Sequence, residues 1–154
     1  MPGRDPLAQF LRLIHEGFAA GNDAVVDEVV APDFVEHQFG LEGSGPAAIA
    51  QLKDAVRGVH RMIPDVQYTV EDVAVVGDTV WVRLLARGTH CVRVMGQEPT
   101  GRPLALQVID VARFRDGLMA EHWGVPDRFA LMMQVGAFPP AHRPEPAPAS
   151  PATG

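Results

Sequence analysis

The spacing of apolar residues changes near Pro64, from a helical period before it to alternation after it. Before Pro64, apolar side chains recur every three or four positions, as on the buried face of a helix. After Pro64, they alternate with polar side chains, as on a half-buried strand. Helices followed by a run of strands predict an α+β domain, in which the helices pack on one face of an antiparallel sheet.

Three helices are predicted in the N-terminal part of the chain. The first spans residues 6–20, which carry a continuous apolar stripe. The second is short, follows Asp23 as its N-terminal cap and stops before Pro32. The third begins at Pro46 and ends before Pro64.

Four long strands are predicted, in two hairpins, over residues 66–76, 79–91, 104–114 and 118–124. Gly77-Asp78 is the turn of the first hairpin, because a leading glycine suits a type II′ turn. A closing helical segment begins at Pro126. Strands of this length curl, so we expect a strongly curved sheet whose concave face and covering helices enclose a cone-shaped cavity.

A single domain is expected over residues 1–137. The chain has 154 residues, of which 47% are hydrophobic, enough to bury a core without disulfides or metals. Its one cysteine, Cys91, excludes an intrachain disulfide and agrees with a reducing compartment. Residues 138–154 are rich in proline and alanine and are expected to be a disordered tail.

The charge pattern excludes several kinds of partner. The formal net charge is −6 and no run of Lys or Arg offsets it, so neither nucleic acid nor an anionic membrane surface is an expected partner. Charged residues from Arg4 to Glu16 interrupt the first apolar segment, so no secretory signal is expected. No apolar run reaches the ~18 residues of a transmembrane helix. The expected location is the cytoplasm.

A carboxylate, Asp110, lies in the middle of a predicted strand that otherwise has the composition of a buried one. Removing an ionised carboxylate from water is costly unless it is paired. Asp110 is therefore expected to have a partner or a chemical task.

The partner of Asp110 depends on the register of the last hairpin. If Arg115-Asp116-Gly117 form a three-residue loop, Asp110 lies opposite His122 on the same face of the sheet. If Asp116-Gly117 alone form the turn, Asp110 lies opposite Trp123 and the pair is lost. We favour the first register. The pair is then either an acid/base couple that works near neutral pH or a buried polar pair that only fixes the register.

The candidate catalytic residues are Asp110, His122 and His90. His90 follows the second long strand and is predicted either to donate a hydrogen bond to substrate at the mouth of the cavity or to cap the next loop. Residues expected to line the cavity and bind substrate are Phe34, Glu36, His37, Trp81, Val108 and Trp123. For Glu36 and His37 the alternative is a position in a solvated loop.

No metal or cofactor is expected. The histidines at 37, 90 and 122 and the carboxylate of Asp110 show none of the short spacings typical of metal ligands. The sequence also lacks a Gly-x-Gly-x-x-Gly motif after a strand, a phosphate-binding loop and a Gly-x-Ser-x-Gly motif.

Several short motifs occur in the order and spacing of a known family. They are Phe34-Val35-Glu36-His37 after Pro32-Asp33, Gly88-Thr89-His90, Pro99-Thr100-Gly101-Arg102, Ile109–Gly117, Glu121-His122-Trp123, and Pro126-Asp127 with Gln134-Val135-Gly136. Across residues 5–137 the chain resembles the SnoaL-like polyketide cyclases of the nuclear transport factor 2-like superfamily. The resemblance implies a cone-shaped sheet closed by helices and assembled as a homodimer or larger homo-oligomer.

The resemblance also implies a reaction, the cofactor-free intramolecular aldol ring closure of a polyketide ester. In that family a pocket Asp acts as acid and base, while a His and polar side chains hold the enolate. This chain has Asp110 at the position of the family's His, Gly124 at that of its Asp and Glu36 at that of its Asn. The carboxylate is therefore moved to the neighbouring strand.

The sequence leaves several functions open. The first is a cofactor-independent enzyme of lyase or isomerase type, which acts by acid/base chemistry on a small hydrophobic, polyketide-like carbonyl compound. A hydrolase or hydroxylase variant would use the same cavity. The second is a non-catalytic protein that binds a small lipophilic molecule, as the glycine at position 124 would suit. The third is an assembly role, in which an exposed face of the sheet builds an oligomer.

Overall fold

The computed structural model describes residues 4–138, and its elements agree with the predicted α+β order. The helical segments are α1 (Pro6–Arg12), η1 (Leu13–Ala19), α2 (Val25–Val29), α3 (Gly45–Met62) and α4 (Arg128–Val135). The predicted first helix is thus an α-helix that continues as a π-helix, η1. Apart from Phe138, the predicted tail lies outside the described residues.

Aspartate side chains cap the N-termini of α1 and α4, but the aspartate predicted to cap α2 does not. Asp5 accepts a hydrogen bond from the Leu7 amide at the start of α1, and Asp127 accepts one from the Ala130 amide at the start of α4. At α2 the prediction was wrong, because the cap position is Ala24 and not Asp23. The Asp23 carboxylate pairs instead with Arg57 of α3.

The strands are β1 (Val30–Glu36), β2 (Gly43–Ser44), β3 (Gln67–Val76), β4 (Thr79–Thr89), β5 (Pro103–Arg115) and β6 (Leu118–Pro126). They form one six-stranded sheet in the order β2-β1-β6-β5-β4-β3. All neighbours are antiparallel except β1 and β6, which are parallel. This parallel pair, which the spacing of apolar residues did not predict, joins the strand that follows α2 to the last strand of the chain.

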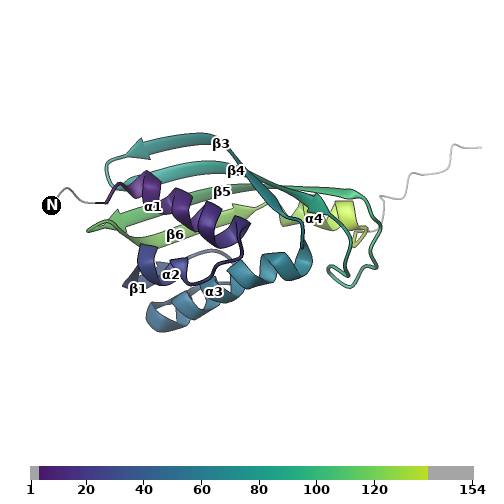
Figure 1. Ribbon diagram of the computed structural model, residues 1–154, viewed down its shortest axis with the longest axis horizontal. Helices are drawn as coiled ribbons and strands as arrows, with labels where there is room; N and C mark the ends of the chain where they lie inside the picture. Colours follow the sequence, from purple (N-terminus) through teal and green to yellow (C-terminus); the bar gives the residue numbers. More distant parts are fainter. Residues whose placement is uncertain (1–3, 139–154) are drawn as a thin grey trace, which may run out of the picture.

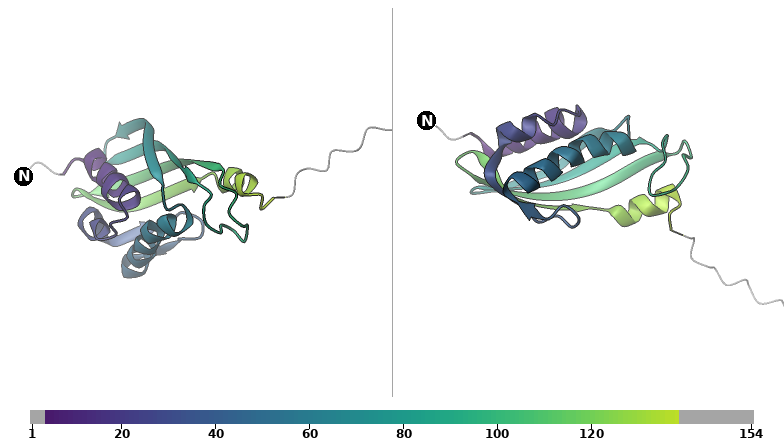
Figure 2. Two further views of the ribbon diagram at one scale, coloured as in Figure 1. Left: turned by 45° about the vertical axis from the view of Figure 1, so that its right-hand side comes forward. Right: turned by 90° about the horizontal axis from the view of Figure 1, so that it is seen from below.

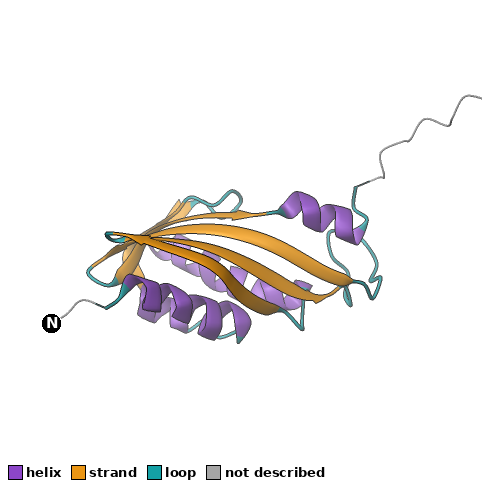
Figure 3. Cartoon of the chain, turned by 90° about the horizontal axis from the view of Figure 1, so that it is seen from above, coloured by secondary structure: helices purple, strands orange, loops and turns teal. Residues whose placement is uncertain are grey.

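The sheet is curled and unclosed, and the helices lie against its concave face (Figures 1 and 3). The main core lies between this face and α1, η1, α2 and α3, with Phe10, Val26, Val56, Val80 and Phe34 among its fully buried side chains. A second apolar cluster at the far end joins α4 to β4, β5 and the end of α3. Figure 2 shows the same arrangement from two other sides, with α3 crossing the concave face and α4 at the end of the sheet.

The last hairpin has a register that neither predicted alternative describes. Its turn is the two-residue turn Asp116-Gly117, in which both residues have positive φ, at 53° and 75°, as a type I′ turn requires. The three-residue loop that we favoured was therefore wrong. A β-bulge then shifts the pairing between Arg113 and Phe114, and the extra residue is Ala120.

This bulge decides which side chains face the cavity. With the two-residue turn alone, Asp110 would lie opposite Trp123 and on the face away from His122. The one extra residue moves the partner of Asp110 to Gly124 and places His122 opposite Ala112. Asp110 and His122 are therefore diagonal neighbours on the same concave face, and not directly opposed as predicted.

A candidate active site on the concave face

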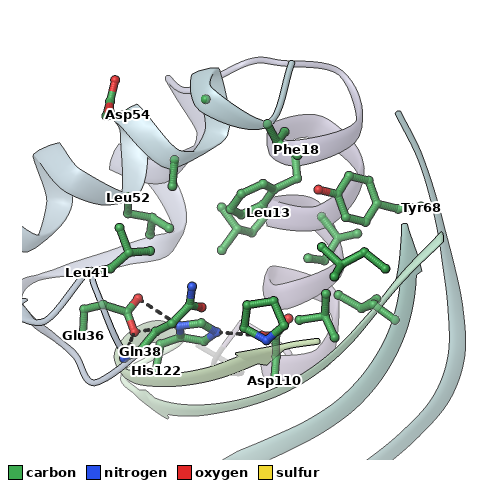
Figure 4. Close-up of a pocket in the computed structure, with 18 of the residues that line it drawn as sticks. Leu13, Phe18, Glu36, Gln38, Leu41, Leu52, Asp54, Tyr68, Asp110 and His122 are labelled. Atoms are coloured by element: carbon green, nitrogen blue, oxygen red, sulfur yellow. Dashed lines mark hydrogen bonds and ion pairs between the residues drawn. The ribbon is translucent and has the colours of Figure 1, made fainter. Parts of the chain in front are cut away.

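A cavity of about 340 Å³ lies between the concave face of the sheet and the helices. Most of its wall is apolar, formed by Phe10, Leu13, Ile14, Phe18, Leu41, Leu52, Leu84, Leu106, Val108 and Met119. Polar side chains from the sheet and from the end of β1 face it as well, among them Glu36, Gln38, Tyr68, Asp110 and His122 (Figure 4). A cavity that is largely apolar with a few convergent polar groups is the usual form of a small-molecule site.

The imidazole of His122 lies between two buried carboxylates. Its Nδ1 is 2.9 Å from Oε2 of Glu36, and its Nε2 is 3.3 Å from Oδ1 of Asp110. The exposed fractions of the three residues are 3% for Glu36, 6% for Asp110 and 8% for His122. The three side chains form one hydrogen-bonded unit at the floor of the cavity, which we call the acid–imidazole cluster.

The sheet topology brings the three members of this cluster together. Glu36 ends β1 and is the direct partner of His122 in the parallel pairing of β1 with β6. Asp110 is on β5, two positions from the residue that pairs with His122. The backbone amide of His37 donates to the carbonyl oxygen of His122 at 2.9 Å and holds the end of β1 against β6.

The two carboxylates keep His122 protonated. Burial alone would lower the pKa of His122, but hydrogen bonds and charge interactions with Asp110 and Glu36 outweigh it and raise the pKa to about 10. At neutral pH the ring is therefore an imidazolium that donates both of its N–H groups to carboxylates. The predicted contact of Asp110 with His122 is therefore part of a three-member unit, in which a second carboxylate, Glu36, adds to the rise in the pKa of His122.

Tyr68 is a polar residue of the cavity that the sequence analysis missed. It lies on β3, and its hydroxyl is directed into the cavity beside Phe18 and Leu13 (Figure 4). Burial, with a smaller effect from the charge of Asp110, raises the pKa of Tyr68 well above its ordinary value. Its hydroxyl therefore keeps its proton and can donate a hydrogen bond inside the cavity.

The structure brings four of the nine predicted site residues into the cavity: Asp110, His122, Glu36 and Val108. Phe34 is fully buried in the main core and does not line the cavity. The alternation of β1 turns Phe34 toward the helices, where it packs as an ordinary core residue.

His90 does not reach the cavity, and the prediction that it binds substrate there does not fit its position. It lies just after β4 and is fully buried beneath residues 91–102. Its backbone amide donates to the Arg102 carbonyl at 2.9 Å, and its Nδ1 is 3.0 Å from Oγ1 of Thr100. His90 therefore anchors the loop that follows, as in the alternative interpretation.

The two tryptophans and His37 lie outside the cavity. Trp81 pairs with Val111 on the convex face of the sheet and is 49% exposed, because its position in β4 alternates with the inward Val80 and Val82. Trp123 also faces outward, where its ring stacks on His37 with ring centroids 4.5 Å apart. His37 and Trp123 line a separate, neighbouring pocket of about 310 Å³.

No group of three or more His, Cys, Asp or Glu side chains within residues 4–138 could hold a metal ion. Over the same residues, no helix is both long and apolar enough to cross a membrane.

The curled sheet, its helical cover and the cavity between them define the nuclear transport factor 2-like fold. The chain belongs to the SnoaL-like polyketide cyclase family, whose family model matches residues 8–135. The family resemblance and the fold expected from the sequence are both confirmed.

Individual relatives agree with this assignment. The chain is 29% identical over 124 residues to the nogalonic acid methyl ester cyclase of Streptomyces nogalater, a match that covers 77% of this chain and 89% of the relative. Among solved structures, IdmH of Streptomyces antibioticus, a candidate polyketide cyclase, is 32% identical with a TM-score of 0.75, over 86% of this chain and 99% of IdmH. TsrD of Streptomyces laurentii is 26% identical with a TM-score of 0.70, over 86% and 93%.

Proposed function

We propose that the protein is a cofactor-independent enzyme that acts by acid/base chemistry on a small hydrophobic, polyketide-like carbonyl compound, with ring closure as its reaction. The observation that carries the proposal is the acid–imidazole cluster at the floor of an apolar cavity. Family membership supports cyclase-like chemistry, and the geometry supports Asp110 as the group that moves the proton.

Asp110 has the position of a general base. Its Oδ1 is held by His122, while Oδ2 makes no hydrogen bond with any of residues 4–138. Oδ2 would remove a proton from a carbon next to a carbonyl group, leaving an enolate. The enolate carbon would then form the new C–C bond to a second carbonyl carbon, whose oxygen would take the proton back from Asp110. Since the product is an isomer of the substrate, the reaction needs no oxidant, reductant or co-reactant.

His122 is a positioning residue in this proposal. Both of its ring N–H groups point at carboxylates, so it does not contact substrate. The cluster carries two carboxylates and one imidazolium, which leaves one net negative charge for the base. His122 thus holds Asp110 in place and offsets the cost of burying two acids.

The first prediction concerns Asp110. Replacing it by Asn keeps the shape of the side chain and removes the base, so kcat should fall by about two orders of magnitude or more while the melting temperature stays near that of the wild type. The assay would follow ring closure of nogalonic acid methyl ester by absorbance and, separately, α-proton exchange of small aryl ketones in deuterated water by NMR.

Tyr68→Phe is the companion variant, because it removes a cavity hydroxyl without removing a charge. We expect a smaller loss of activity from it than from Asp110→Asn. Full activity in Asp110→Asn would eliminate Asp110 as the base and with it the proposed reaction.

One observation favours a second function, the non-catalytic binding of a lipophilic molecule. The family's catalytic carboxylate position is Gly124 in this chain, and Asp110 and His122 could merely orient a ligand. A ligand that is recovered unchanged after long incubation, with Asp110→Asn altering only its affinity, would favour this function over catalysis.

We also propose a homodimer, formed through the convex face of the sheet, and a cytoplasmic location. The convex face carries partly exposed apolar side chains on three adjacent strands, among them Trp81, Ile109 and Val125. The helices do not cover this face (Figure 3). A second copy of the chain would remove these side chains from water.

A further inference from the structure

Gly124 leaves an unusual space at the floor of the cavity. It lies directly opposite Asp110 on the concave face, and its φ is not positive, so the backbone there does not require glycine. A Cβ atom built at Gly124 would stand 1.9 Å from Oε1 of Gln38 and 3.0 Å from Cε1 of His122. The glycine therefore makes room for the side chain of Gln38.

The carboxamide of Gln38 occupies this space without a protein partner. The backbone amide of Gln38 donates to Oε1 of Glu36 at 2.8 Å, which fixes the residue beside the acid–imidazole cluster. Within residues 4–138 the carboxamide itself makes no hydrogen bond to another residue. Figure 4 shows its nitrogen directed from the floor into the cavity, next to His122.

We infer that Gln38 is the substrate-binding residue whose amide N–H holds a carbonyl oxygen of the substrate beside Asp110. The inference rests on the proposed function, since a general base needs its carbonyl group held within reach. The two carboxylates of the cluster would repel an oxygen on which negative charge develops, so a neutral N–H donor is the group the site requires. The ligand class is a ketone or ester attached to an apolar body.

Gln38 also lies at the boundary between the two pockets. It lines both the cavity and the neighbouring pocket of about 310 Å³, together with Pro126 and Arg128. A carbonyl group held at Gln38 would therefore place the apolar body of the substrate over the cluster and direct any further substituent toward the second pocket.

A binding experiment without turnover tests this role. The probes are 2-acetylnaphthalene and 2-ethylnaphthalene, which match in apolar size and differ in one carbonyl oxygen, and their affinities are measured by calorimetry. Gln38→Met keeps the length of the side chain and removes the donor. We expect it to weaken binding of the ketone about tenfold and to leave the hydrocarbon within about twofold. Gln67→Met, on exposed β3 outside the cavity, is the matched control and should change neither.

A double-mutant cycle tests the part played by Gly124. Gly124→Ala should displace the carboxamide and remove the preference for the ketone, whereas the same substitution in a Gln38→Ala background should remove nothing further. Equal weakening of both probes by Gln38→Met, or no weakening of either, would overturn the inference.

The outcome is separable from that of the proposed reaction. If Asp110→Asn stays fully active while Gln38→Met selectively loses the ketone, the carbonyl-binding role stands and the proposed base is wrong. If Asp110→Asn is inactive and Gln38→Met binds both probes normally, the reaction stands and the oxygen is held elsewhere.

Discussion

At the scale of single residues, the site depends on one imidazole that two acids surround. The sequence predicted the contact of Asp110 with His122 but missed Glu36 as the second partner, because a parallel pairing between distant strands leaves no local signal. Gln38 and Tyr68 were missed for a related reason. The sequence around Gln38 does not show that Gly124 leaves space for its side chain. The sequence around Tyr68 does not show that the curl of the sheet turns its side chain into the cavity.

The raised pKa of His122 predicts how stability depends on pH. In the folded protein the pKa is about 10, against roughly 6.5 in an unfolded chain. The protonated ring therefore stabilises the fold fully below about pH 6.5, and this contribution is lost as the pH rises toward 10. Urea unfolding at several pH values should show the free energy of unfolding falling across this window, with a slope that approaches about 1.4 kcal/mol per pH unit between the two pKa values.

Two histidine variants separate this effect from other titrations. His122→Gln should flatten the dependence, because the titrating ring is gone. His15→Gln, at an exposed position of η1, should keep the wild-type slope. An unchanged slope in His122→Gln would show that the ring is not held protonated by its two acids.

At the scale of elements, the periodicity of apolar residues predicted the helices and the long strands, and the family resemblance supported the curled sheet. The register of β5 and β6 could not be predicted, since it depends on a bulge at Ala120 that local composition does not mark. The two-residue turn was one of the two predicted alternatives and implied that Asp110 lies away from His122. The bulge shifts the pairing by one residue and returns Asp110 to the same face as His122. The short strand β2 was also missed, because its two residues are too few to show an alternation of apolar and polar side chains.

The turn Asp116-Gly117 gives a prediction at this scale. Gly117 has a φ of 75°, and an added Cβ would stand 2.8 Å from Cβ of Arg4. Gly117→Ala should therefore lower the free energy of unfolding by about 1–2 kcal/mol or more, through backbone strain and this contact. Gly101→Ala is the control, because Gly101 has a φ of 69° with open space around it. Thermal unfolding of the two variants should place Gly117→Ala lower, and equal melting temperatures would show that the contact with Arg4 has no cost.

At the scale of the whole molecule, the two faces of the sheet have different surroundings. The concave face is covered by helices and carries the cavity, while the convex face exposes Trp81 and Ile109, each to 49%. The sequence has apolar residues on both faces of β4, which was enough to suggest that the outer face contacts another sheet. The prediction that Trp81 lines the cavity was less secure, because a period of two does not say which face of the sheet is concave.

The homodimer proposed for the convex face gives the last prediction. Sedimentation velocity at micromolar concentration should show a dimer for the wild type and a monomer for Trp81→Arg, since a buried guanidinium without a partner would destabilise the interface. Met133→Arg, on α4, should remain dimeric. A monomeric wild type at these concentrations would contradict the proposal.

The parallel pairing of β1 with β6 affects the order in which the acid–imidazole cluster assembles during folding. Glu36 and His122 are 86 positions apart in the chain, so they can meet only after a long loop has closed. The hairpins β3–β4 and β5–β6 can form earlier from local contacts, but within β5–β6 the imidazole has only Asp110 as a partner, and Glu36 reaches it only with β1. A refolding chain should therefore regain most of its secondary structure before it regains the proposed activity, and the delay between the two signals would measure how long β1 takes to pair with β6.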